Sequence, residues 1–218
     1  MSDRDGGEGL DSRIADLALQ RFRRGGFAGT SIADLAGILG VSKAAVYYHY
    51  RSKDTLLHRL VDPLLDAIDA CIDAHSTPTP AGPVGSLAAR QLLGDYLAVL
   101  IAHQEVVALV ATDVAVLNHH TIGPRIRAQD QRLRTLLVAP DASPAATLRA
   151  EAALGAIRRP VTTQITVDLT DALQQILVDA AVGILEAGHR GRSSPPQKPR
   201  GAVAATGTDN HTDHIEQP

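Results

Sequence analysis

The segment from Gly40 to Lys53 reads GVSKAAVYYHYRSK and gathers side chains whose chemistry suits a polyanion. It holds three of the four tyrosines in the chain, although aromatic residues make up only 3% of the sequence. Lysine ammonium groups and tyrosine hydroxyls donate hydrogen bonds to phosphate oxygens, and such contacts hold a protein in register on a duplex. The segment therefore predicts a set of phosphate contacts, made by Tyr47, Tyr48, His49 and Lys53.

Two short helices joined by a glycine would have to position these side chains. Ser31 can cap the first helix, with Asp34 three residues later as its capping-box partner, and Ser42 can cap the second. Gly40 lies between them and tolerates the left-handed backbone that a sharp turn requires. Two short helices with such a turn form a helix-turn-helix, which places its second helix in the major groove of DNA.

The first residues of the second helix would face base edges in that groove. Lys43 can donate to guanine O6 or N7, or to a phosphate. Ala44 and Ala45 are small enough for close approach, and a methyl group can contact the thymine methyl. Thr30, before the first short helix, could donate to the flanking DNA backbone. The predicted DNA-binding residues are Thr30, Ser31, Ser42, Lys43, Ala44, Ala45, Tyr47, Tyr48, His49 and Lys53.

The charge distribution separates a basic head from an acidic body. The range from Arg13 to Leu60 contains eight basic and three acidic residues. The range from Val61 to His189 contains eight arginines and fourteen acidic residues. This asymmetry indicates that a polyanion would bind the head only. The single cysteine, Cys71, fits a reducing cytoplasm. The sequence has no phosphate-binding glycine loop, no nucleophile with a placed base and no metal-ligand spacing, so neither an enzyme nor a metal site is predicted.

Runs with a helical period dominate the sequence, which predicts an all-α fold. The first helix is expected to begin at Ser12. A long helix should follow Lys53, and Pro63 inside it should kink it. One face of the long helix is apolar, and the opposite face carries four aspartates, Asp62, Asp66, Asp69 and Asp73.

Composition divides the chain into four segments. Both ends are rich in polar, glycine and charged residues and are predicted to be disordered. The predicted segments are a disordered start at 1–11, a helix-turn-helix domain at 12–56, a helical body at 57–188 and a disordered tail at 189–218. Further helices are expected at 85–103, 105–120, 123–138, 144–159 and 168–187, with a loop at 160–167.

From about Ile14 to Leu60 the head resembles the TetR family of bacterial transcriptional regulators. The family pattern is matched in order and spacing by GGFAGTSIADLAGILGVSKAAVYYHYRSKDTLL. Tyr50 stands where phenylalanine is usual and is expected to pack inside the head with Val46. The residues that carry the resemblance are Gly26, Phe27, Thr30, Ile32, Leu35, Ala36, Gly40, Val41, Ser42, Tyr47, His49 and Lys53.

The resemblance implies about nine helices, with the first three binding DNA and the rest forming a ligand-binding body. It also implies a homodimer, in which 144–159 and 168–188 would pack against a second copy, although their apolar faces could equally be ordinary core. The expected function is a cytoplasmic repressor that a small-molecule effector releases from a double-stranded DNA operator. The alternative is a helix-turn-helix adaptor or activator without small-molecule control.

Pro63 would be either a pivot for this release or a kink that only shapes packing. No cofactor and no membrane association are expected.

Polar residues inside apolar helical runs are the candidate ligand contacts. The scarcity of aromatic residues favours an aliphatic or acyl-like ligand. Asp113 lies in VVALVATDVAVL, where a buried charge needs a partner. That partner could be a ligand amine or an arginine such as Arg125 or Arg127, or else Asp113 faces solvent. The predicted ligand-binding residues are Cys71, Tyr96, His103, Asp113 and Asn118.

His119 and His120 raise the question of a metal, but neighbours on a helix point about 100° apart. They are therefore not expected to share an ion.

Overall fold

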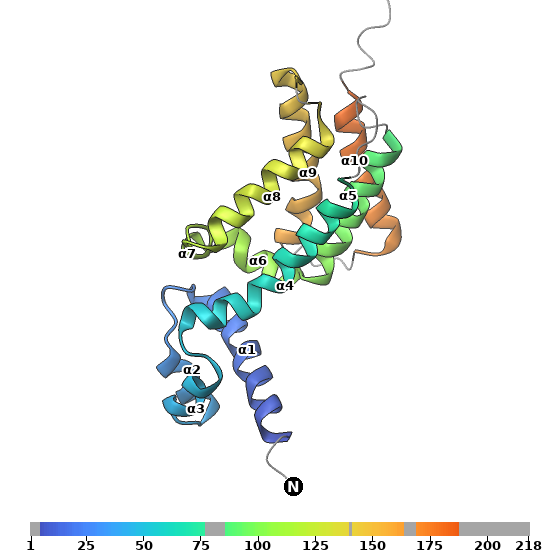
Figure 1. Cartoon of the computed structure of the whole chain (residues 1–218). Helices are drawn as coiled ribbons and strands as arrows, with labels where there is room; N and C mark the ends of the chain where they lie inside the picture. The colour runs from blue at the N-terminus through green and yellow to red at the C-terminus, as the bar shows by residue number, and fades with distance from the viewer. Residues whose placement is uncertain (1–4, 77–85, 140, 164–168, 188–218) are drawn as a thin grey trace, which may run out of the picture.

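The computed structural model describes residues 5–76, 86–139, 141–163 and 169–187, and every regular element in this part of the chain is a helix (Figure 1). The all-α prediction is confirmed. The helices are α1 (Asp5–Gly25), α2 (Ile32–Leu39), α3 (Lys43–His49), α4 (Lys53–Ala74), α5 (Ser86–Ala102), α6 (Gln104–Thr112), α7 (Val114–Leu117), α8 (Ile122–Leu137), α9 (Pro144–Thr162) and α10 (Asp171–Glu186).

Helices α1 to α3 form the head, and local capping rules explain how α2 and α3 begin and end. The Ser31 hydroxyl accepts from the Asp34 N–H, while the Asp34 carboxylate accepts from the Ser31 N–H at 3.0 Å, so the capping box is complete. The Ser31 hydroxyl also donates to the Asp34 carboxylate, and this bond, followed by that from the Ser31 N–H, lowers the pKa of Asp34. Gly40 has φ 67°, the left-handed conformation expected for the turn. Tyr50 is buried in the head core, as predicted.

Helix α4 connects the head to the body (Figure 1). Leu57 and Val61 pack in the head core, the cluster built on α1 to α3 that Leu109, Val116 and Ile122 also join. Leu64 and Ile72 pack in the body core, the cluster that they form with α5, α9 and α10. Leu65, next to Leu64, belongs to the head core and also lines a cavity of the body. One continuous helix therefore contributes to both hydrophobic clusters.

The body packs α10 against α9 and α5, and α4 against α5 and α8. Its core is almost wholly aliphatic, and Tyr96 is its one aromatic residue. Among the described residues, no single helix combines the length and apolarity needed to span a membrane; only α5 and α6 taken together would, and they meet at 90°.

Several predicted boundaries are corrected by the structure. Helix α1 begins at Asp5 rather than at Ser12. The Tyr50 hydroxyl donates to the Asp11 carbonyl at 3.5 Å, which fixes this first part of α1 to the head. The predicted helix at 105–120 is two helices, α6 and α7, separated at Asp113.

The predicted loop at 160–167 also begins too early. Helix α9 continues through Pro160 to Thr162. Val161 packs in the body core, and its burial offsets the hydrogen bond that the proline removes. Three ranges lie outside the described residues: 164–167 of that loop, the segment at 77–85 and the predicted tail at 189–218.

Candidate nucleic-acid interface and ligand pocket

Helix α3 presents a polar, aromatic surface to solvent. The Ser42 hydroxyl accepts from the Ala45 N–H at 3.1 Å and caps the helix, while Val46 on its other side is fully buried. Lys43 is exposed, and Tyr47 and Tyr48 are 49% and 86% exposed. Two large aromatic side chains left in water beside a lysine form a surface suited to stacking and hydrogen bonding with a partner.

Lys53, predicted to bind phosphate, has a structural role within the head. Its ammonium group donates to the carbonyls of Phe27 at 2.7 Å, Thr30 at 3.0 Å and Ala28 at 3.4 Å. The same group lies 4.4 Å from the centroid of the Phe27 ring. These contacts use all three donors of the ammonium group and fix the α1–α2 loop to the start of α4. Its contact with phosphate stays a prediction.

Three other predicted contacts are partly engaged inside the head. Thr30 is buried, and its hydroxyl donates to the Gly26 carbonyl at 3.0 Å. Ser31 is exposed, but its hydroxyl donates to Asp34 at 2.7 Å. The His49 ring faces α1, with Nδ1 4.0 Å from a carboxylate oxygen of Asp11. The freely presented part of the predicted interface is therefore the exposed side of α3, comprising Lys43, Ala44, Tyr47 and Tyr48.

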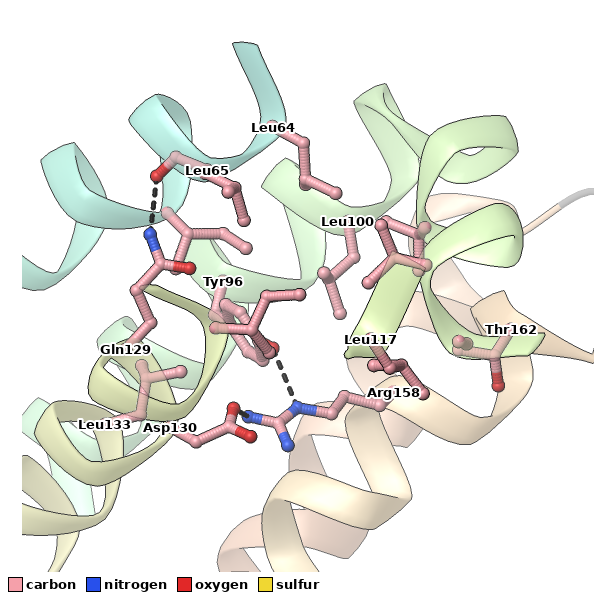
Figure 2. Close-up of a pocket in the computed structure, with 15 residues that line it drawn as sticks. Leu64, Leu65, Tyr96, Leu100, Leu117, Gln129, Asp130, Leu133, Arg158 and Thr162 are labelled. Carbon is pink, nitrogen blue, oxygen red and sulfur yellow. Dashed lines mark hydrogen bonds and ion pairs between the residues drawn. The ribbon is translucent and has the colours of Figure 1, made fainter. Parts of the chain in front are cut away.

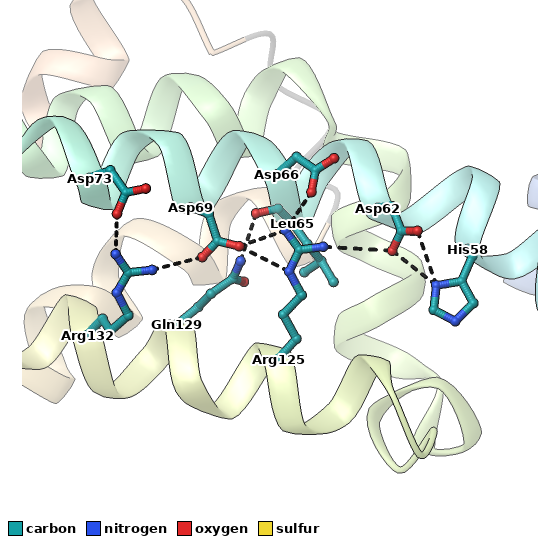
Figure 3. Close-up of polar contacts among 9 residues, drawn as sticks. All are labelled: His58, Asp62, Leu65, Asp66, Asp69, Asp73, Arg125, Gln129 and Arg132. Carbon is teal, nitrogen blue, oxygen red and sulfur yellow. Dashed lines mark hydrogen bonds and ion pairs between the residues drawn. The ribbon is translucent and has the colours of Figure 1, made fainter.

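The acidic face of α4 is paired with α8 (Figure 3). Arg125 donates to Asp66 at 2.6 Å and to Asp69 at 2.7 and 3.0 Å. Arg132 donates to Asp69 at 3.1 Å and also to Asp73. Burial acts to raise the pKa of Asp69, but hydrogen bonds, led by that from Arg125, outweigh it and lower the pKa. These ion pairs clamp α4 to α8.

Asp113 does not have the arginine partner considered from the sequence. One carboxylate oxygen accepts from the N–H groups of Ala115 at 2.8 Å and Val116 at 3.3 Å, which caps α7. The other accepts from the Phe27 N–H at 2.5 Å. Arg125, one of the two arginines considered as a partner, instead binds the aspartates of α4. Asp113 therefore ties the α1–α2 loop of the head to the body.

A cavity of about 190 Å³ lies within the body, and α4 forms one wall (Figure 2). Most of its lining is aliphatic, and its polar residues are Tyr96, Gln129, Asp130, Arg158 and Thr162. The aliphatic wall consists of Leu64, Leu65, Ile68, Leu100, Val107, Val110, Ala111, Leu117, Ile126 and Leu133.

The polar groups of the cavity form a connected cluster. Arg158 Nε donates to the Tyr96 hydroxyl at 2.8 Å, and Arg158 Nη2 donates to Asp130 Oδ1 at 2.5 Å (Figure 2). Burial raises the pKa of Tyr96, so its phenol stays protonated at neutral pH. Burial acts to lower the pKa of Arg158, but Tyr96 and Asp130 outweigh it and raise the pKa. The cluster thus combines one positive, one negative and one neutral group.

Of the five predicted ligand residues, the structure places Tyr96 in the wall of this cavity. Cys71 packs in the body core, and burial raises the pKa of its thiol to about 11. His103 occupies the position before α6, and Asn118 ends α7 and is exposed. Neither these three nor Asp113 lines the cavity.

Arg158 and Asp130, the charged residues of the cavity, were missed from the sequence. A weak signal existed for Arg158, because Leu154, Ile157 and Val161 around it form a buried stripe. An arginine beside such a stripe is placed to reach into the core with its long apolar stem.

The fold and the exposed α3 define a helix-turn-helix protein with a separate helical body. The chain matches, over residues 14–60, the model of bacterial regulatory proteins, tetR family, and this match covers the head and the start of α4. It is 32% identical over 82 residues to TtgR of Pseudomonas putida and, over the same length, to EthR of Mycolicibacterium smegmatis, both HTH-type transcriptional regulators. The aligned segment covers 38% of this chain and 38% of each of these relatives.

Solved structures share the fold over about four fifths of the chain. A TetR-family member from Streptomyces coelicolor superposes with a TM-score of 0.61 at 23% identity, covering 80% of this chain and 90% of that one. The ketosteroid regulator KstR2 of Mycobacterium tuberculosis gives a TM-score of 0.61 at 18% identity, covering 82% and 94%. At these sequence identities, the superpositions establish the fold of the head and of the body.

Proposed function

We propose that this protein is a DNA-binding transcriptional regulator, acting as a homodimeric repressor that a small molecule releases from its operator. The observation that carries the proposal is the exposed side of α3, with Lys43, Tyr47 and Tyr48 on a capped helix-turn-helix. Such a helix enters the major groove with its first residues against base edges. Lys43 and Ala44 would then read sequence, while the tyrosine hydroxyls would bind phosphates.

A second copy would pack on α9 and α10. Leu148 on α9 is 70% exposed and Ile176 on α10 is 60% exposed. Small exposed residues on the same helices allow close approach of another helix, namely Ala152, Gly155, Ala180 and Gly183. Pairing these faces would bury apolar side chains that are costly to leave in water. A dimer would present two copies of α3 to successive major grooves.

Ligand control would act through α4. Leu64, Leu65 and Ile68 of this helix line the cavity, and the same helix begins in the head at Lys53. A molecule that fills the cavity would push α4 and change the separation of the two heads. Because the two recognition helices must fit grooves about one helical turn apart, a changed separation lowers affinity for the operator.

Selection of bound fragments from genomic DNA would supply an operator, and fluorescence anisotropy would then measure affinity against salt concentration. Phosphate contacts make the affinity fall steeply with salt. Tyr47→Phe should weaken binding to all sequences several-fold, because one hydroxyl hydrogen bond is lost. Lys43→Met should alter the preferred sequence and lower the salt slope by up to about one if Lys43 also contacts a phosphate. Asp141→Asn, an exposed change in the body, is the matched control.

The proposal fails if the purified protein does not bind double-stranded DNA at low ionic strength. Strong binding that no small molecule weakens would instead favour a regulator without ligand control.

A further inference from the structure

The cavity of the body is small. Its volume of about 190 Å³ slightly exceeds the roughly 150 Å³ of an engineered apolar cavity that holds benzene. It is smaller than the roughly 300–1,000 Å³ of pockets for drug-sized ligands. A ligand that fills it would have on the order of ten non-hydrogen atoms.

The charges that line the cavity balance each other. Among its described lining residues, Arg158 and Asp130 carry formal charge, and they are in direct contact at 2.5 Å. A ligand carboxylate that shared the Arg158 guanidinium with Asp130 would leave a net negative charge beside the aliphatic wall, and one that displaced Asp130 would leave that carboxylate without its partner. An uncharged ligand avoids both costs.

The cluster still offers a hydrogen-bond donor. The Tyr96 oxygen accepts from Arg158 Nε, so the hydroxyl hydrogen remains available to donate. Tyr96 is 3% exposed, and its ring lies beside the aliphatic wall (Figure 2). A carbonyl oxygen at the end of an aliphatic chain would accept from this hydroxyl while the chain packs against the leucines.

We propose that the cavity binds an uncharged aliphatic molecule of about ten non-hydrogen atoms that bears one carbonyl group, and that it discriminates against the corresponding carboxylate. The carbonyl lies at Tyr96 and Arg158, and the chain lies along Leu64, Leu65 and Leu100. This inference rests on the proposed function only in taking the cavity as the effector site.

Octanamide and octanoate form the test pair, since they have the same shape and differ in charge. Isothermal titration calorimetry on the full chain at pH 7.5 should give at least tenfold tighter binding for octanamide. Asp130→Asn, which is itself nearly isosteric, leaves the charge of Arg158 unbalanced. The variant should therefore shift the preference toward octanoate by at least tenfold relative to the unsubstituted protein.

A second carboxylate–arginine pair provides the matched control. Glu151 on α9 accepts from Arg134 on α8 at 2.5 Å, outside the cavity lining. Glu151→Gln removes a charge from the same pair of helices and should leave the preference unchanged. If Asp130→Asn does not fold, as judged by circular dichroism, Tyr96→Phe tests the site instead, and it should weaken octanamide several-fold.

Octanoate binding as tightly as octanamide, or an unchanged preference in folded Asp130→Asn, would overturn the proposal. Failure of both ligands to bind would overturn the assigned size and class. Calorimetry needs no DNA, so these results are independent of operator binding. Octanamide that binds without releasing the operator would refute control through this cavity and leave the ligand class standing.

Discussion

Replacing Lys53 with methionine separates its structural role from a contact with DNA. Methionine keeps most of the apolar stem but removes the donors to the carbonyls of Phe27 and Thr30. Hydrogen bonds to charged groups contribute about 1.5–3 kcal/mol each, and part of this is offset because the ammonium no longer has to be desolvated. We therefore expect Lys53→Met to lower the free energy of unfolding by about 2–3 kcal/mol. For a chain of this size that corresponds to a Tm lower by roughly 4–12 °C.

Differential scanning calorimetry would measure this change, with Arg51→Met as the control. Arg51 is exposed in the turn before α4, so its substitution removes the same charge from the head without removing the loop contacts. The reasoning would be refuted if Lys53→Met left the Tm equal to that of the control. A salt slope for DNA binding lower by about one, with an unchanged Tm, would instead assign Lys53 to a phosphate.

Three further outcomes follow from the same contacts. Arg125→Gln should lower the free energy of unfolding by about 1–2 kcal/mol, because the partly exposed pairs with α4 are lost. Because the pKa of Asp69 is lowered in the folded protein, its carboxylate stabilises the fold above about pH 4, and this stabilisation is lost as pH falls through the folded pKa. In Arg125→Gln the free energy of unfolding, measured by urea titration, should therefore fall less steeply with decreasing pH. Asp113→Ala should cost about 1–3 kcal/mol, seen as a lower urea midpoint, since it removes the α7 cap and the bond to the head; an unchanged midpoint would contradict this. Leu148→Glu should make the protein monomeric in analytical ultracentrifugation at micromolar concentration, and a persistent dimer would exclude this face.

Local rules in the sequence were enough to predict the helix-turn-helix. The caps at Ser31 and Ser42 and the left-handed turn at Gly40 involve residues within a few positions of each other. Asp113 also obeys a local rule, because its carboxylate caps α7 two and three residues later. Its capping signal was overlooked because the surrounding apolar run predicted one long helix. A short polar residue within such a run can therefore mark a helix boundary by capping the helix that follows it.

The cavity could not be predicted from the same rules. The hydrogen bond from Arg158 to Tyr96 spans 62 positions, and the bond from Arg158 to Asp130 spans 28. Helical periodicity identifies which face of each helix is buried, but it does not say which helices pack together. Tyr96, which lines the cavity, is a candidate from the sequence because it is polar within an apolar run. Its charged partners lie at the edges of buried stripes, where arginine and aspartate are ordinarily exposed to solvent.

The position of Pro63 in α4 bears on whether it is a pivot or only a packing feature. Proline has no N–H, so the carbonyl of Arg59, four residues earlier, lacks its helical hydrogen bond and bending there is cheaper. On the head side of this point, Leu57 and Val61 are fixed in the head core. On the body side, Leu64 lines the cavity and Asp69 is held by Arg125. Leu65, two residues beyond Pro63, packs with Leu57 and Val61 and also lines the cavity, so the weakest turn of α4 lies beside the point where the two clusters meet and where a pivot would act.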